Sequence, residues 1–162
     1  MEDMIKLLIV DDETRFLNAI AQRLTKRGFD VRTASNGRDA IALADQEKFD
    51  IALLDLKMPG MDGGEVLKVL KQAHQFLEAI VLTGHGSLDS AVELTKLGAF
   101  SYLPKPYELE KLIEVLKNAY EARLKKKFAA DEAKMEKIVA LASGESPLGI
   151  LRKMRTLDDS RR

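Results

Sequence analysis

Short runs of apolar residues alternate along the chain with longer stretches in which apolar residues recur every third or fourth position. Such short runs are typical of buried strands, and the three-to-four-residue recurrence is typical of helices that bury one face. Strands are therefore predicted at 4–10, 29–34, 50–55, 78–84 and 99–104. Helices are predicted between them, at about 16–27, 35–48, 62–74 and 87–97, and a further helical pattern begins at Tyr107.

The strict alternation of strand and helix with short connections predicts an α/β fold. Right-handed crossover connections place helices on both faces of a parallel sheet. The expected architecture is a flavodoxin-like, doubly wound, five-stranded parallel sheet of strand order 2-1-3-4-5, followed by an extended C-terminal helix. In sheets of this kind the functional crevice lies at the carboxyl ends of the strands, near strands one and three.

Composition narrows the kinds of site that the chain can carry. No apolar run approaches the roughly 18 residues of a membrane span, and "MEDMIK" has no signal-peptide pattern, so we expect a soluble, cytoplasmic protein without membrane contact. The chain has no cysteine, and two histidines, His74 and His85, leave little for a zinc site. Any metal is therefore expected to be a hard cation held by oxygen atoms.

Carboxylates follow two of the predicted strands. Asp11 and Asp12 come directly after the first strand, and Asp55 ends the third. Taken alone, Asp11 or Asp12 could equally cap the next helix. In the order 2-1-3-4-5, however, all three carboxylates converge at one edge, where they repel one another unless a divalent cation holds them ionised. Mg²⁺ fits this set, and the backbone carbonyl of Lys57 could also reach it.

Two further strand ends supply complementary groups. The fourth strand ends at Thr83, a hydroxyl donor, and the fifth runs into Lys105, an ammonium group that precedes Pro106. Alone, each could be an ordinary surface residue. Together with the carboxylates they form a site for an anion with several oxygen atoms, and a phosphoryl group is the obvious candidate. The sequence has neither a P-loop nor a GxGxxG motif, so no nucleotide is expected at this site by the usual cradle.

Four segments resemble the sequence blocks of one family, the receiver domains of bacterial two-component response regulators. They are "LLIVDDE", "DIALLDLKMPGMDG", "AIVLTGHG" and "LGAFSYLPKP", in the family's order, within residues 4 to about 120. The resemblance implies that Asp55 is the phosphoacceptor. It also implies that Asp12 is a direct Mg²⁺ ligand, that Asp11 assists through water, and that the Lys57 carbonyl is a third ligand.

The same resemblance implies roles for the remaining site residues. Thr83 and Lys105 would bind the phosphoryl oxygens, and Tyr102 matches an aromatic switch position whose ring turns inward when Thr83 moves. Lys57 and His85 would tune the lifetime of the phosphoryl group, or they are solvated loop residues. The Lys105–Pro106 bond is expected to be cis. The phosphoryl donor would be a sensor histidine kinase, and the signal would leave through helix four, strand five and helix five.

Residues 121–162 differ from residues 1–120 in net charge. They hold 11 Lys and Arg against 7 Asp and Glu, whereas residues 1–120 hold 15 against 19. We predict a receiver domain over 1–120 and a helical extension over 121–162, which is too short for a complete output domain. The apolar stripe predicts that helix five continues to about residue 142. It could pair with another chain, fold back, or remain a solvated helix.

The function expected from these features is phosphoacceptor signalling to a protein partner or through a homodimer. The chain would catalyse only its own phosphoryl transfer and autodephosphorylation, so it is not expected to be an enzyme acting on external substrates. DNA binding is the alternative, because "LGILRKMRTL" resembles the recognition helix of Fis-type modules, although the preceding helix of such a module is missing. A phosphohydrolase of the haloacid-dehalogenase type would need an Asp-x-Asp spacing that "VDDET" lacks.

Overall fold

The computed structural model describes residues 4–55, 63–84, 92–93 and 95–159 of the chain. Five parallel strands form one sheet in the order β2-β1-β3-β4-β5, so the predicted order is confirmed. The strands are β1 (Lys6–Val10), β2 (Asp30–Ala34), β3 (Ile51–Asp55), β4 (Glu78–Thr83) and β5 (Ser101–Pro104). The helices are α1 (Thr14–Lys26), α2 (Gly37–Gln46), α3 (Gly63–Ala73), α5 (Leu109–Lys127), α6 (Glu132–Ala142) and α7 (Pro147–Asp159). Most of the helix predicted at 87–97 lies outside the described residues.

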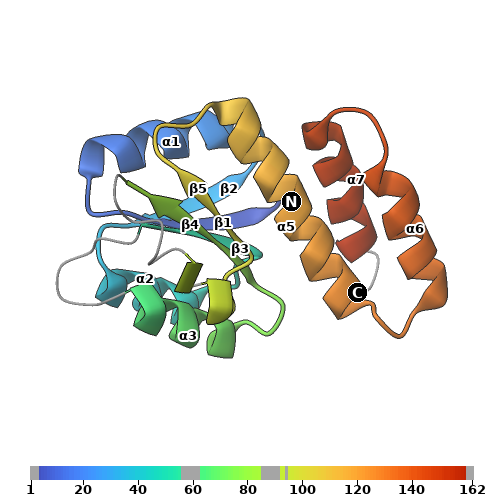
Figure 1. Cartoon of the computed structure of the whole chain (residues 1–162), viewed down its shortest axis with the longest axis horizontal. Coiled ribbons are helices and arrows are strands. Elements are labelled where there is room, and N and C mark those ends of the chain that lie inside the picture. Colours follow the sequence, from blue (N-terminus) through green and yellow to red (C-terminus); the bar gives the residue numbers. More distant parts are fainter. Residues whose placement is uncertain (1–3, 56–62, 85–91, 94, 160–162) are drawn as a thin grey trace.

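Helices cover both faces of the sheet (Figure 1). Helices α1 and α5 lie on one face, and α2 and α3 lie on the other. Successive side chains of a strand point to opposite faces, and β3 shows the result. Ile51 and Leu53 belong to the core under α1 and α5, whereas Ala52 and Leu54 belong to the core under α2 and α3. This double burial explains the continuous apolar run that precedes Asp55.

Local interactions set the ends of two helices. The side chain of Asn36 accepts a hydrogen bond from the backbone N–H of Asp39 at 2.8 Å and so caps α2. Gly28 follows α1 with a φ of +98°, a conformation that favours glycine.

The prediction of one continuous helix from 107 to 142 is wrong at residues 128–131. Helix α5 ends at Lys127, and the Asp131 side chain caps α6 by accepting a hydrogen bond from the Lys134 backbone N–H at 3.1 Å. Phe128 at the break is buried, as is Ile138 of α6. A straight helix would leave this apolar stripe in water, and folding back buries it within the same chain.

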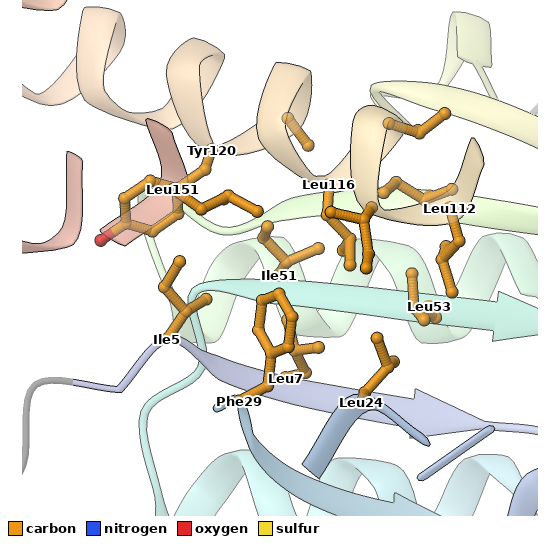
Figure 2. Close-up of a cluster of buried hydrophobic side chains, with 14 of the residues drawn as sticks. Ile5, Leu7, Leu24, Phe29, Ile51, Leu53, Leu112, Leu116, Tyr120 and Leu151 are labelled. Atoms are coloured by element: carbon orange, nitrogen blue, oxygen red, sulfur yellow. The ribbon is translucent and has the colours of Figure 1, made fainter. Parts of the chain in front are cut away.

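Helices α6 and α7 form a hairpin that packs beside α5, and residues 132–159 are called the C-terminal hairpin below (Figure 1). Leu151, Met154 and Leu157 of α7 are buried and belong to the same core cluster as β1 and α5. In Figure 2, Leu151 lies next to Tyr120 of α5, near Ile5 at the start of the chain's first strand. The hairpin therefore extends the core of the sheet rather than forming a separate one. In the described part of the chain no helix is long and apolar enough to cross a membrane.

A buried carboxylate holds the end of α7 against α5. Asp158 is 2% exposed and accepts hydrogen bonds from the Tyr120 hydroxyl at 2.6 Å and from Arg123 Nε at 3.2 Å. Lys127 Nζ also donates to Asp158, and Arg155 Nη1 lies 3.5 Å from Oδ2 of the same carboxylate. These five residues, Tyr120, Arg123, Lys127, Arg155 and Asp158, are called the Asp158 cluster. Because the carboxylate is paired on several sides, its burial is tolerated.

A second carboxylate, Asp50, connects this cluster to the sheet. Its Oδ2 accepts a hydrogen bond from the Lys6 backbone N–H at 2.9 Å, and its Oδ1 lies 3.2 Å from Arg123 Nη2. Arg155 Nη1 lies 4.0 Å from Oδ2 of the same carboxylate. Asp50 immediately precedes β3, and Lys6 begins β1. The starts of the two central strands are thus linked to both α5 and α7.

The Asp158 cluster predicts how stability depends on acidity. Burial raises the pKa of Asp158, but the hydrogen bonds from Lys127 and Tyr120 and the charge of Arg123 outweigh it, so the pKa lies below its ordinary value. The stabilisation is therefore complete above the unfolded pKa of about 3.9 and is lost as pH falls through the lower folded value. We expect urea denaturation to show stability falling below about pH 4, with a shallower fall in Asp158→Asn. If the free energy of unfolding fell equally steeply with pH in the unmodified chain and in Asp158→Asn, this assignment would be contradicted.

Candidate functional site

The carboxyl ends of β1 and β3 bring three carboxylates together. Val10 of β1 is in register with Leu54 of β3, so Asp11 and Asp12 leave the sheet beside Asp55. One carboxylate oxygen from each of Asp11, Asp12 and Asp55 lies within 4.8 Å of the others. Asp11 and Asp55 are buried, and Asp12 is exposed. The predicted convergence is present, with one side chain on the solvent side of the group.

Asp11 is fixed by two hydrogen bonds. Its Oδ1 accepts from the Glu13 backbone N–H at 2.9 Å, and its Oδ2 accepts from Lys105 Nζ at 2.9 Å. The first bond holds the turn that precedes α1, whose N-cap residue is Glu13 and not Asp11. The second joins it to a residue of the far edge of the sheet. Asp11 therefore serves the local turn and the site together.

Lys105 reaches two of the three carboxylates. Its Nζ lies 3.7 Å from Asp55 Oδ1 in addition to its contact with Asp11, and its side chain is 20% exposed. The Lys105–Pro106 peptide bond is cis, as predicted. A positive charge between two buried carboxylates reduces their mutual repulsion. The ammonium group is thus already positioned beside the predicted nucleophile.

Two aromatic residues that the sequence did not single out support Lys105. Its Nζ lies 4.2 Å from the centre of the Phe16 ring, close enough for a cation–π interaction. Phe16 in turn meets Tyr107 edge to face, with ring centres 6.0 Å apart. Burial, and then the charge of Asp11, raise the pKa of Tyr107, so its hydroxyl stays neutral. In the sequence, Phe16 fits the apolar, core-facing stripe of α1. Its contact with Lys105 therefore could not be predicted from the pattern.

The remaining predicted residues are only partly described. Thr83 is the last residue of β4, next to Pro104 of β5, and its side chain lies outside the described part. Lys57 and His85 also lie outside it. Tyr102 is in β5 and is 36% exposed. The roles of these four residues stay predictions.

The donor atoms of the site suit a magnesium ion. Hard divalent cations take oxygen ligands, and Mg²⁺ uses one or two carboxylates together with water and phosphate oxygens. Asp12, on the exposed side, and Asp55 offer carboxylate oxygens to such an ion, while Asp11 is held by Lys105 and the Glu13 backbone. A single acidic triad with a water-facing side is an arrangement that Mg²⁺ can enter without losing all its waters.

Comparison with known proteins agrees with this geometry. Residues 7–117 match the model of the response regulator receiver domain. A receiver domain protein from Clostridium thermocellum has the same fold, with a TM-score of 0.71 at 34% sequence identity, over 78% of this chain and 99% of that one. The receiver domain is a two-component signalling domain, and the strands and carboxylates described above fall inside the matched range.

Relatives in longer proteins extend the comparison. NtrC of Salmonella typhimurium, a DNA-binding transcriptional regulator, is 36% identical over 111 residues, which are 68% of this chain and 24% of NtrC. The transcriptional regulatory protein GlrR of Escherichia coli is 34% identical over 155 residues, 96% of this chain and 32% of GlrR, so most of the C-terminal hairpin is aligned as well. This chain thus spans a quarter to a third of these two relatives. The match over residues 7–117 and the shared fold show that the chain belongs to the response regulator receiver domain family.

Proposed function

We propose that Asp55 of this receiver accepts a phosphoryl group from a phosphohistidine of a sensor histidine kinase. The observation that carries the proposal is the meeting of Asp11, Asp12 and Asp55 beside the ammonium group of Lys105. A carboxylate is a competent nucleophile toward phosphorus when charge developing on the transferred group is neutralised. The positive charge of Lys105, 3.7 Å from Asp55, is placed to do this.

The proposed step balances without a further reactant. An oxygen of the Asp55 carboxylate forms a bond to phosphorus, and the bond between phosphorus and the histidine nitrogen of the kinase breaks. The electron pair of that bond stays on the imidazole, and Asp55 becomes an acyl phosphate. In this proposal Lys105 and Thr83 then contact the phosphoryl oxygens. Hydrolysis of the acyl phosphate by water resets the domain, and no external substrate is turned over.

Mg²⁺ is the cofactor that we propose for this step. Asp12 and Asp55 would hold it directly, Asp11 through water, and the Lys57 carbonyl would complete the protein ligands. When bound, the ion neutralises charge on the transferring phosphoryl oxygens. The protein's own part is to orient the carboxylates. Lys105 and the Glu13 backbone do this at Asp11.

The signal is proposed to leave the domain through a surface away from Asp55. We propose that phosphorylation changes the face formed by helix four, strand five and helix five, where Tyr102 is exposed, and that a protein partner or a second copy of the chain reads it. The extended helix that could have formed a dimer is shorter than predicted, and its apolar stripe is covered by the hairpin. Dimerisation through that stripe would require the hairpin to leave.

DNA binding by residues 121–162 has weaker support. Leu151, Met154 and Leu157 of α7 are buried, and Arg155 is paired with Asp158, so these residues are not displayed as a free recognition helix would display them. Only Arg152 and Lys153 form an exposed basic pair in the middle of α7. We therefore assign the C-terminal hairpin to the receiver core. NtrC is named as DNA-binding, but most of its length is not represented in this chain.

The proposed chemistry is tested by incubating the chain with Mg²⁺ and a small phosphodonor. We expect intact-mass spectrometry to show the gain of one phosphoryl group, and peptide mapping to place it on Asp55. Chelating the metal beforehand is expected to lower the rate by at least about 100-fold, because charge on the phosphoryl oxygens is then neutralised by Lys105 alone. Phosphorylation at full rate without divalent cation would contradict the metal assignment, and modification of another residue would contradict the nucleophile.

A further inference from the structure

A cavity of about 830 Å³ lies at the end of the sheet opposite to the carboxylate site, and it is called the basal cavity here. The start of β1 and the segments 46–50 and 73–76, which lead into β3 and β4, form one wall. Helices α5 and α7 form the other. Its volume is in the range of about 300–1,000 Å³ that is usual for small-molecule sites. The receiver sheet and the C-terminal hairpin therefore line this half-open space together.

Positive charge predominates in the basal cavity. Five cationic side chains line it, namely Lys6, Lys48, Arg123, Lys127 and Arg155. Three acidic side chains line it as well, namely Glu47, Asp50 and Asp158. Of these, Glu47 is neutralised from outside the cavity, because its Oε2 lies 3.0 Å from Arg32 Nε. Asp50 and Asp158 are shared among Arg123, Lys127 and Arg155, so three cations face two carboxylates.

Two of the lining cations form no ion pair with any acidic side chain that the structure describes. Among the described residues, neither Lys6 nor Lys48 takes part in an ion pair. They lie on the receiver side of the cavity, across from the arginines of α5 and α7. A multivalent anion between the two walls would contact both sets of cations. Such contacts are charge-assisted and stronger than neutral hydrogen bonds.

Uncharged groups in the lining indicate the rest of the ligand. Gln46 and Gln75 offer amide donors and acceptors, and Phe49 and Phe76 offer apolar surface. An inorganic ion alone would fill only part of about 830 Å³. We infer that the basal cavity binds a small organic molecule that carries at least two anionic oxygen groups, either phosphates or carboxylates. This site is distinct from Asp55 and does not depend on phosphorylation.

Binding in the basal cavity would also strengthen the attachment of the C-terminal hairpin. The cations on one wall belong to the receiver, and Arg155 on the other belongs to α7. A ligand that contacts both walls binds only when the hairpin is docked. By mass action it therefore favours the docked state and raises the unfolding temperature.

The test uses pyrophosphate and citrate as probes, titrated into the full chain in buffer free of divalent cations and at constant ionic strength. We expect calorimetry to give a dissociation constant below about 1 mM for at least one probe, with a rise in unfolding temperature. The Lys6→Gln/Lys48→Gln double variant is expected to bind roughly tenfold more weakly, because about 1.4 kcal/mol of charge contact is lost. Since neither lysine forms an ion pair within the described part of the chain, this variant is expected to fold normally.

A matched control distinguishes specific binding in the basal cavity from general electrostatic attraction of the probe to the protein. Lys68 of α3 and Lys137 of α6 are exposed and do not line the cavity, so the Lys68→Gln/Lys137→Gln double variant removes the same two positive charges elsewhere. We expect this variant to bind the probe as the unmodified chain does. Equal weakening in the control and in the Lys6→Gln/Lys48→Gln variant would overturn the proposal, as would the absence of binding by both probes. The preferred probe identifies whether the natural ligand carries phosphates or carboxylates.

Discussion

Asp55→Asn is expected to abolish phosphorylation of the chain by a small phosphodonor in the presence of Mg²⁺, with a loss of at least about 100-fold in rate. The amide lacks the charge and the electron density of a carboxylate nucleophile. Asp11 and Asp12 lie within 4.8 Å but do not replace it, since Asp11 is already bound by Lys105 and the Glu13 backbone. Intact-mass spectrometry over a time course measures the loss directly.

The control for this variant is Asp45→Asn, which makes the same chemical change at an exposed position of α2. It is expected to be phosphorylated at the unmodified rate. Thermal unfolding of both variants shows whether the change at Asp55 alters the fold as well as the chemistry. A single phosphoryl group that still appears on Asp55→Asn at an undiminished rate would place the nucleophile elsewhere.

Asp158→Asn is expected to destabilise the chain strongly through the C-terminal hairpin. The carboxylate accepts from Tyr120, Arg123 and Lys127, and its removal leaves buried cations without their main counter-charge. Breaking a buried ion pair by removing one partner costs about 3–5 kcal/mol. The lower end, about 3 kcal/mol, is expected here, because Asp50 still faces Arg123 and Arg155 and because Lys127 retains contact with water.

Urea denaturation at neutral pH measures this loss as a change in the free energy of unfolding. Asp45→Asn again serves as the control, and a change within about 0.5 kcal/mol is expected for it, as for other surface substitutions. A loss at Asp158 no larger than that of the control would mean that the buried cations find other partners. In that case the hairpin would be held by its apolar contacts alone.

The sequence predicted the sheet and the meeting of its site residues because both depend on local patterns. The alternation of strand and helix implies the order of the strands, and the carboxyl ends of neighbouring parallel strands necessarily lie together. Four site residues are predicted from their places at or just after the ends of strands, namely Asp11, Asp12, Asp55 and Lys105. The cis bond before Pro106 came from the family resemblance and not from the pattern.

The break after α5 was missed because the apolar stripe alone does not show where a helix turns back. Phe128 and Ile138 keep helical spacing with the residues before them, and no glycine or proline interrupts residues 128–131. The one local signal is Asp131, a good helix cap, followed by Glu132. A solvated helix and a folded hairpin share this sequence pattern, and burial of the stripe against α5 decides between them.

The ionic links at the base of the sheet could not be predicted either. Asp50 and Asp158 are far apart in the sequence, and each stands beside residues that give no hint of a partner. The contacts of Arg123 with both carboxylates exist only once α7 has docked. Pairings of this kind depend on tertiary structure and leave no periodic trace. The contact of Lys105 with the Phe16 ring was hidden for the same reason.

The link between Asp50 and Arg155 also bears on how the chain folds during synthesis. Asp50, which bonds to the start of β1, is synthesised well before Arg155 and Asp158, which follow every strand of the sheet in the sequence. Until then, Tyr120 and the apolar end of α5 lack the cover that α7 later provides. Exposed apolar surface of this kind is where nascent chains associate. Helix α7 therefore completes this part of the core, and the nascent receiver remains open to chaperones until α7 is made.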